Sequence, residues 1–102
     1  MASLIFAYWA AKTKHPGALE SPERQRIIIK RLVESGDNVS EMLYVVDGLV
    51  KDEHRMGRNG TSKKYDGITS IFRTRETVEN LAGNIRAYRD GVPHETAEKY
   101  GL

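Results

Sequence analysis

Hydrophobic residues recur three and four positions apart along most of this chain, a spacing typical of helices that bury one face. Strand-like alternation of hydrophobic and polar residues is absent from the sequence, which disfavours an α/β fold. The pattern therefore predicts an all-α protein, a compact bundle of four to five short helices. A basic, glycine-rich loop is expected between the third helix and the fourth.

Residues that favour helix ends delimit the first two helices. Ser3 is suited to cap a helix that reaches about Lys14, and His15-Pro16-Gly17 ends it, because proline disfavours α geometry in the residue before it. Ser21-Pro22 is a second start, with Gly36 as the left-handed stop after about Glu34. The residues expected to be buried are Leu4, Ile5, Tyr8 and Trp9 in the first helix, and Ile27, Ile28, Leu32 and Val33 in the second.

A third helix is predicted after Asn38, which together with Glu41 has the form of a capping box. Its apolar positions, at spacings of three and four, are Met42, Leu43, Val46, Leu49 and Val50. Gly48 inside this helix lowers helix propensity by about 1 kcal/mol relative to alanine. We therefore interpret Gly48 as a point where another helix approaches closely.

The chain from 54 to 67 is irregular, with three glycines and an Asn59-Gly60 pair suited to a type I′ turn. A short helix is expected over Ile68–Phe72, with Ile68, Ile71 and Phe72 in the core. Thr74 is expected to cap a longer helix that ends at Gly91, with Val78, Leu81, Ile85 and Tyr88 as its apolar stripe. Pro93 is expected to start a last short helix that stops near Gly101.

The 102 residues suffice for one domain, so a single helical unit over 1–102 is expected. The chain contains no cysteine, which excludes disulfides and cysteine-ligated metal sites. The longest apolar run near the start, Leu4 to Ala11, is too short to span a bilayer and has no basic segment before it. A membrane protein and a secreted precursor are therefore both disfavoured.

The positive charge is concentrated in one segment. Residues 1–50 are neutral, residues 51–75 carry seven basic and three acidic side chains (+4), and residues 76–102 carry −2. Such a patch attracts phosphate, although an ordinary solvated loop has the same composition. Tyr65 lies between Lys64 and Asp66, where it would either stack on an unpaired base or pack the loop onto the core. The candidate DNA contacts are Arg55, Arg58, Lys63, Lys64, Tyr65, Arg73 and Arg75, with Arg24, Lys30 and Arg31 on the second helix as secondary candidates.

Catalytic signatures are lacking in the sequence. His15, His54 and His94 lie in separate loops or helix starts, where surface or capping roles are expected. The glycine-containing stretch from Gly57 to Lys64 matches neither the Walker spacing nor the dinucleotide fingerprint. Trp9 is expected in the core. We therefore expect a protein without enzymatic activity, metal or cofactor.

Several short signatures together resemble the C-terminal module of bacteriophage and prophage replication-initiation proteins (replisome organisers), which is related in style to the C-terminal domains of DnaD-like primosomal proteins. The resemblance covers about residues 4–82, with 83–102 as a helical tail. The matching segments are Phe6-Ala-Tyr-Trp9, His15-Pro16, Ser21-Pro-Glu-Arg-Gln-Arg-Ile-Ile28, Val46-Asp-Gly48, Arg55-Met-Gly-Arg-Asn59, Lys63-Lys-Tyr-Asp66 and Ile68-Thr-Ser-Ile-Phe-Arg73.

The resemblance implies a module that contacts DNA and brings in the replicative helicase or its loader, in the cytoplasm of a bacterial host. In that family a winged-helix DNA-binding domain precedes the module, whereas here Met1 stands only a few residues before it. Gly67 departs from the family pattern, which more often has an acidic residue there.

Two functions follow as expectations. The first is a DNA-replication accessory module that binds single-stranded or duplex DNA with little sequence specificity. The alternative is a stand-alone protein-interaction module that inhibits a host or phage protein. That alternative predicts weak DNA binding and an exposed apolar hot spot that includes Met56.

Overall fold

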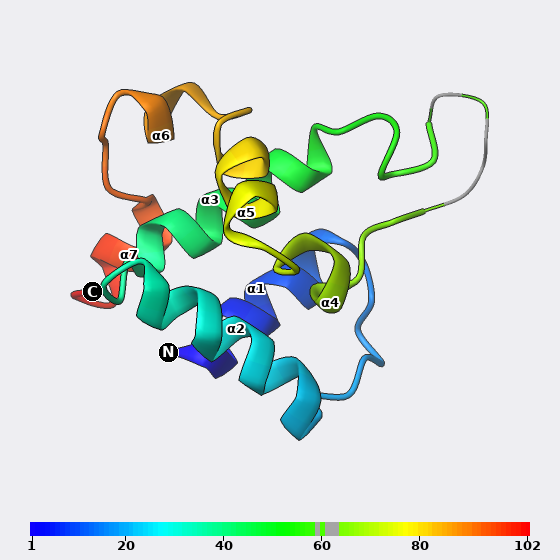
Figure 1. Ribbon diagram of the computed structural model, residues 1–102, viewed down its shortest axis with the longest axis horizontal. Helices are drawn as coiled ribbons and strands as arrows, with labels where there is room; N and C mark the ends of the chain where they lie inside the picture. The colour runs from blue at the N-terminus through cyan, green and yellow to red at the C-terminus, as the bar shows by residue number, and fades with distance from the viewer. Residues whose placement is uncertain (59, 61–63) are drawn as a thin grey trace.

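The computed structural model describes residues 1–58, 60 and 64–102, and within these the chain forms seven helices and no strand (Figure 1). The all-α prediction is confirmed. The number of helices exceeds four to five because the chain after residue 67 forms four short helices. The helices are α1 (Ala2–Lys12), α2 (Pro22–Glu34), α3 (Val39–Val50), α4 (Ile68–Ile71), α5 (Arg75–Ala82), α6 (Arg86–Arg89) and α7 (Glu95–Lys99).

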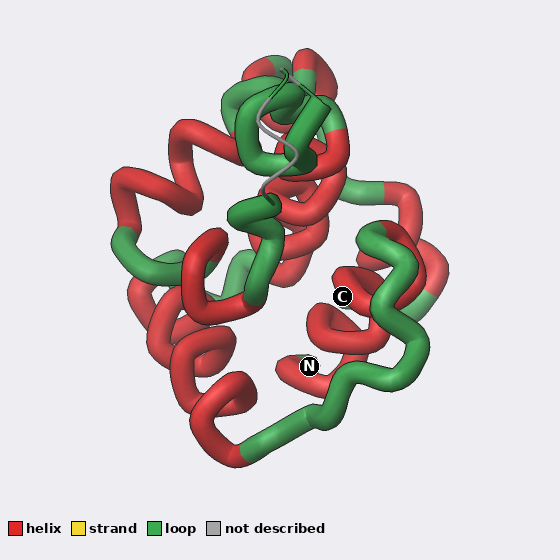
Figure 2. Tube along the Cα trace, turned by 90° about the vertical axis from the view of Figure 1, so that its right-hand side faces the viewer, coloured by secondary structure: helices red, strands yellow, loops and turns green. Residues whose placement is uncertain are grey.

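Helix α3 is the centre of the bundle, and α1, α2, α4, α5 and α7 all pack against it (Figures 1 and 2). The expected stripe on α3 is present, but Tyr44 and Val45 on its other sides are buried as well. A helix that is apolar nearly all round must be enclosed by neighbours. The rest of the core is supplied mainly by Ile5, Phe6, Trp9, Ile28, Leu32, Ile68, Ile71, Phe72, Val78 and Leu81.

Gly48 marks the point where α3 and α5 approach most closely. A Cβ atom built on Gly48 would lie 1.7 Å from the carbonyl oxygen of Leu81 and 2.5 Å from its carbonyl carbon. Because these are backbone atoms, no side-chain rotation could make room. The predicted close helix–helix approach is confirmed.

Three predicted helix caps are confirmed by their hydrogen bonds. The side-chain oxygen of Ser21 accepts from the Arg24 amide at 3.2 Å, and that of Asn38 accepts from the Glu41 amide at 3.0 Å. Thr74 caps α5 in the same way, at 3.0 Å from the Thr77 amide. The carboxylate of Glu41 does not complete the capping box, however, because it points into the protein.

The first helix differs from its prediction at both ends. Helix α1 begins at Ala2, and the Ser3 hydroxyl donates to Glu20 at 2.6 Å instead of capping the helix. Helix α1 ends two residues early because the Thr13 hydroxyl donates to the Trp9 carbonyl and Lys14 adopts a positive φ of 60°. Phe6 is buried where Leu4 and Tyr8 were expected, and these two are half-buried.

The predicted helix from 74 to 91 is wrong as one element and forms α5 and α6. Ile85 between them has extended geometry, with φ −106° and ψ 121°. The side chain of Asn84 donates to the Gly48 carbonyl at 3.2 Å, which ties the break to α3. The last helix, α7, starts after His94 rather than at Pro93.

The described parts of the α3–α4 connection project away from the helices, on the right in Figure 1. Both chain termini lie at the opposite side in the same view. Asn59 and Lys63 lie outside the described residues, and so does the predicted Asn59-Gly60 turn. The connection therefore presents its described residues at one end of the molecule.

Candidate nucleic-acid interface

A surface hollow of about 250 Å³ lies where the two described arms of the α3–α4 connection meet α4. Three of its lining residues, Arg55, Tyr65 and Arg73, are predicted DNA contacts. The other two are His54 and Ser70. The fold thus brings residues 18 positions apart in the sequence onto one small concave surface.

Arg55 holds the two arms together. Its carbonyl accepts from the Tyr65 amide at 2.6 Å, and its guanidinium donates to the Tyr65 carbonyl at 3.2 Å and to the Ser70 hydroxyl at 2.9 Å. The carboxylate of Asp52 accepts from the Arg55 backbone amide at 2.9 Å. Among the described residues the side chain of Arg55 binds neutral oxygens and no carboxylate, so no contact there cancels its positive charge.

Tyr65 stands at the surface rather than in the core. Its ring stacks on the His54 imidazole with centroids 5.5 Å apart and planes inclined by 16°, and 40% of the residue is exposed. A ring exposed to this extent is accessible to a ligand, as the base-stacking interpretation requires. The position suits an aromatic platform, although no ligand is needed to hold the ring there.

Three exposed cations of residues 51–75 have no ion-pair partner among the described residues: Lys51, Lys64 and Arg73. Of these, Lys51 lines a different cleft, whereas Arg73 lines the hollow and Lys64 adjoins Tyr65. Arg58 is different, because it pairs with Glu53 at 3.1 Å and donates to the Val50 carbonyl at 2.6 Å, which closes the end of α3. The uncancelled positive charge of this surface is thus carried by Arg55, Lys64 and Arg73.

Two predicted contacts are corrected by the structure. Arg75 forms a two-point ion pair with the buried carboxylate of Glu41 and a second pair with Glu79 at 3.0 Å. The hydrogen bonds that Arg75 donates to Glu41 are the largest cause of the raised pKa of Arg75. Arg31 has only 7% of its side chain exposed and pairs with Glu34 at 2.7 Å. Both guanidiniums are therefore engaged by carboxylates of the protein itself.

The two other secondary candidates lie in different places. Arg24 lies over the Trp9 ring at 5.9 Å from its centroid, and the Trp9 indole N–H donates to the Asp66 carbonyl at 2.7 Å. Arg24 is thereby brought next to the segment that carries Lys64. Lys30, by contrast, is exposed on the outer face of α2.

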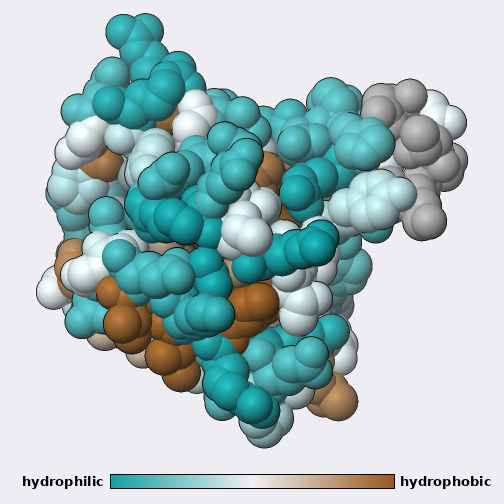
Figure 3. Space-filling model, viewed as in Figure 1, coloured by the Kyte–Doolittle hydropathy of each residue, from teal (hydrophilic) through white to brown (hydrophobic). Residues whose placement is uncertain are grey.

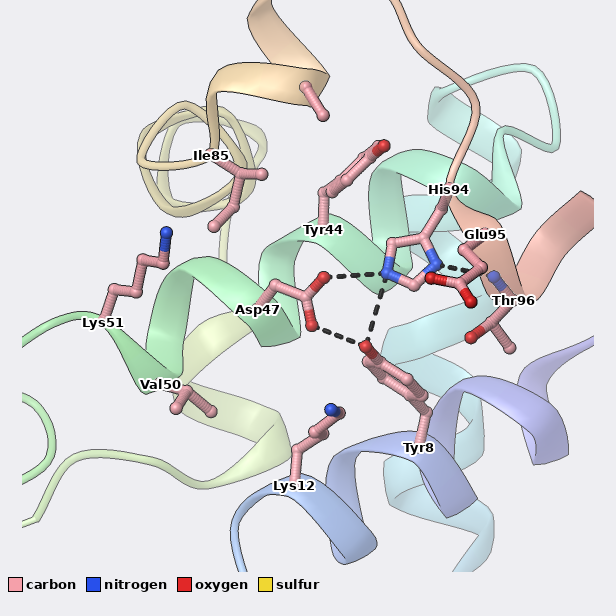
Figure 4. A pocket seen from close by; sticks show the side chains of 11 residues that line it. Tyr8, Lys12, Tyr44, Asp47, Val50, Lys51, Ile85, His94, Glu95 and Thr96 are labelled. Atoms are coloured by element: carbon pink, nitrogen blue, oxygen red, sulfur yellow. Dashed lines mark hydrogen bonds and ion pairs between the residues drawn. The ribbon is translucent and has the colours of Figure 1, made fainter.

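A larger cleft of about 690 Å³ lies on another side, between α1, α3 and α7 (Figure 4). In it the carboxylate of Asp47 accepts from the Tyr8 hydroxyl at 2.6 Å and binds Nε2 of His94 at 2.8 Å. Burial and the hydrogen bond to Asp47 raise the pKa of Tyr8. Sequence reasoning missed this cluster because its members come from α1, α3 and the residue before α7, which share no motif.

The hydrogen bonds of this cluster link α1, α3 and the start of α7, and their arrangement fits a structural role rather than a catalytic one. His94 Nδ1 accepts from the Thr96 amide at 3.0 Å and so caps α7, which leaves Nε2 as the protonated nitrogen that donates to Asp47. Both ring nitrogens are therefore engaged, and the imidazole has no free lone pair for a general base. The capping role predicted as one option for the histidines is confirmed for His94.

No group of three His, Cys, Asp or Glu side chains among the described residues is placed to hold a metal ion. None of the described helices has the length and apolar character needed to cross a bilayer. No protein-family model, curated protein or solved structure matches the chain.

Proposed function

We propose that this chain is a non-catalytic accessory module of phage or prophage DNA replication that binds DNA with little sequence specificity. The observation that supports it most is the hollow lined by Arg55, Tyr65 and Arg73, with Lys64 beside it. The resemblance to replisome-organiser modules supports the replication context.

The proposed contacts are of two kinds, ionic contacts to phosphates and stacking on a base. Arg55, Lys64 and Arg73 bind backbone phosphates, which position a strand without reading its sequence. Tyr65, already stacked on His54, offers its aromatic ring to an unpaired base. Two carboxylates lie nearby. Asp52 accepts a hydrogen bond from the Arg55 amide and Glu53 pairs with Arg58, so both repel the strand less than carboxylates without such contacts would.

Binding to a labelled single strand should be strongly salt-dependent. With the three phosphate contacts of Arg55, Lys64 and Arg73, affinity for a single strand is expected to fall about 20-fold between 50 and 200 mM salt, because counterions are released from the strand on binding. K64A/R73A should flatten the salt slope by about two contacts and weaken binding to unrelated sequences equally. Fluorescence anisotropy with a single strand and a matched duplex measures both effects.

The matched control is R86A/K99A, which removes the same charge from α6 and α7. Arg86 and Lys99 are exposed and lie away from the hollow. If both double variants lose the same affinity, the effect is one of net charge and the proposed surface is wrong. A flat salt response of the parent protein would dispose of the nucleic-acid function itself.

A second candidate function, contact with a protein partner, is favoured by the outer face of α2. Ile29 and Val33 are 47% and 66% exposed there, one helical turn apart. Figure 3 shows hydrophobic side chains grouped at the lower left of the molecule, over this region. Arg26 and Lys30 flank them on the same face. Met56, the residue expected in such a hot spot, is half-buried against the core instead.

I29S/V33S is expected to abolish binding to the replicative helicase or its loader while leaving DNA affinity unchanged. Since both side chains are exposed, the free energy of unfolding should change by less than about 0.5 kcal/mol. Biolayer interferometry with each purified partner, beside anisotropy with DNA, separates the two functions. Parallel loss of both activities would instead indicate a single shared surface.

A further inference from the structure

We propose that a second hollow, on the other side of residues 64–67, binds a phosphate group of the same nucleic-acid strand. This inference rests on the proposed function. The hollow has a volume of about 520 Å³ and lies between the α1–α2 loop and the segment that leads into α4. Its polar wall is formed by Lys14, His15, Arg24 and Asp66, and Trp9 forms its aromatic wall.

The guanidinium of Arg24 is held in place before any ligand arrives. One nitrogen donates to the Leu19 carbonyl at 2.7 Å, and the group lies 5.9 Å from the centroid of the Trp9 ring. Arginine has five N–H donors, and the others of Arg24 have no partner among the described residues. A fixed guanidinium with unused donors binds phosphate at a lower entropic cost than a mobile one.

Lys14 supplies the second cation. It is exposed, forms no ion pair with a described residue, and adopts a φ of 60°, a left-handed conformation that is uncommon for lysine. The loop therefore holds this lysine at the rim of the hollow in a conformation that its own backbone disfavours.

The one carboxylate in the wall is already satisfied. Asp66 is buried, and its Oδ2 atom lies 2.9 Å from Nε2 of His15, whose ring stacks on Trp9 at 5.3 Å between centroids. Two cations, Lys14 and Arg24, thus face one carboxylate that is engaged with an imidazole. The balance of charge favours an anion in the hollow.

The two hollows lie on either side of the same segment, so one strand can occupy both. Tyr65 lines the first hollow and Asp66 the second, and the Cα atoms of consecutive residues are about 3.8 Å apart. Trp9 fixes this wall by donating its indole N–H to the Asp66 carbonyl. A strand stacked on Tyr65 therefore passes within reach of Arg24 and Lys14 as it crosses the segment.

Trp9 is the only tryptophan of the chain, so its fluorescence reports on the second hollow. The probes are inorganic phosphate and a short oligothymidine with and without a 5′-phosphate. We expect a saturable change of fluorescence, and about tenfold weaker oligonucleotide binding by K14N and by R24Q. Asparagine suits the positive φ of residue 14, so K14N tests the site even if R24Q disturbs the Trp9 contact. The matched control is R26Q, on the same helix but outside the hollow.

Each outcome decides between two sources of phosphate or against the site. If the 5′-phosphate strengthens binding and K14N removes that gain, the hollow holds a strand terminus. If K14N weakens both oligonucleotides equally, it holds an internal phosphodiester. If K14N and R24Q behave like R26Q while K64A/R73A still weakens binding, the second site is wrong and the proposed function stands. If phosphate alone changes the Trp9 signal of the parent but not of K14N, and no oligonucleotide binds, the phosphate site stands and the nucleic-acid function is wrong.

Discussion

Replacing Gly48 by alanine is expected to destabilise the protein by more than about 3 kcal/mol, at or above the upper end of the range for overpacked sites. The added methyl group would overlap the Leu81 carbonyl, 1.7 Å away, so α3 and α5 must separate along their whole contact. Separation opens voids around Val78 and Leu81, which are fully or almost fully buried. Against a total stability of about 5–15 kcal/mol, such a loss is large.

Helix propensity and packing predict changes of opposite sign in the free energy of unfolding of G48A. On helix propensity alone, alanine at an interior helical position stabilises by about 1 kcal/mol relative to glycine. The matched control is G17A, because a Cβ at Gly17 meets no atom within 4 Å and its φ is not positive. Urea denaturation should show G17A near the parent and G48A far below it. Stabilisation by G48A would mean that α3 and α5 do not pack as described.

Local signals in the sequence predicted the starts of α2, α3 and α5, although they misplaced those of α1 and α7. Ser21, Asn38 and Thr74 each cap a helix because a side-chain oxygen two or three residues before a free amide needs no tertiary partner. Gly48 was predictable for a related reason, since a glycine inside an apolar helix has few explanations other than close approach.

Predictions that depended on how the helices pack failed. Arg31 was a predicted DNA contact, yet only 7% of its side chain is exposed in the packed bundle, and it pairs with Glu34 on the same helix. The helix expected over 74–91 is interrupted near Asn84, whose side chain binds a carbonyl of α3. Periodicity describes one helix at a time, so it cannot show which polar residues find buried partners on another.

The candidate interface was predictable in its charge and not in its shape. Concentrated positive charge identified Lys64, Arg73 and Arg55, and the structure places them around the α3–α4 connection. The approach of Arg24 to this surface depends on Trp9 holding the Asp66 carbonyl, a contact across 57 residues. Charge density is a property of composition, whereas the hollows are created by packing: the first by the α3–α4 connection against α4, and the second by the end of α1, the α1–α2 loop and α2 against residues 66–67.

R75A is expected to lower the free energy of unfolding by about 3 kcal/mol, the lower end of the range for breaking a buried ion pair. The positive charge of its segment had made Arg75 a predicted DNA contact. Glu41 is 3% exposed, and Arg75 binds both of its carboxylate oxygens. Without the guanidinium, the carboxylate keeps one hydrogen bond from the side chains that the structure describes, donated by the Tyr88 hydroxyl at 2.6 Å. The lower end applies because 37% of the Arg75 side chain is exposed, so water can enter the vacated position.

The same variant separates a structural role from a DNA contact. In R75A/E41Q the buried group is neutral, so part of the lost stability should return, because an amide costs less to bury than an unpaired charge. R86A is the matched control, since Arg86 has 85% of its side chain exposed and only a 3.4 Å contact to Asp90. Such a pair contributes at most about 0.5 kcal/mol. Such measurements need both stability and binding: thermal and urea unfolding measure stability, and anisotropy below the unfolding transition measures DNA affinity.

If R75A stays as stable as R86A but loses DNA affinity, Arg75 belongs to the nucleic-acid interface. We expect the opposite result, a loss of stability with DNA affinity retained. That result would show that Arg75 serves to pair with Glu41 and so stabilises the packing of α5 against α3.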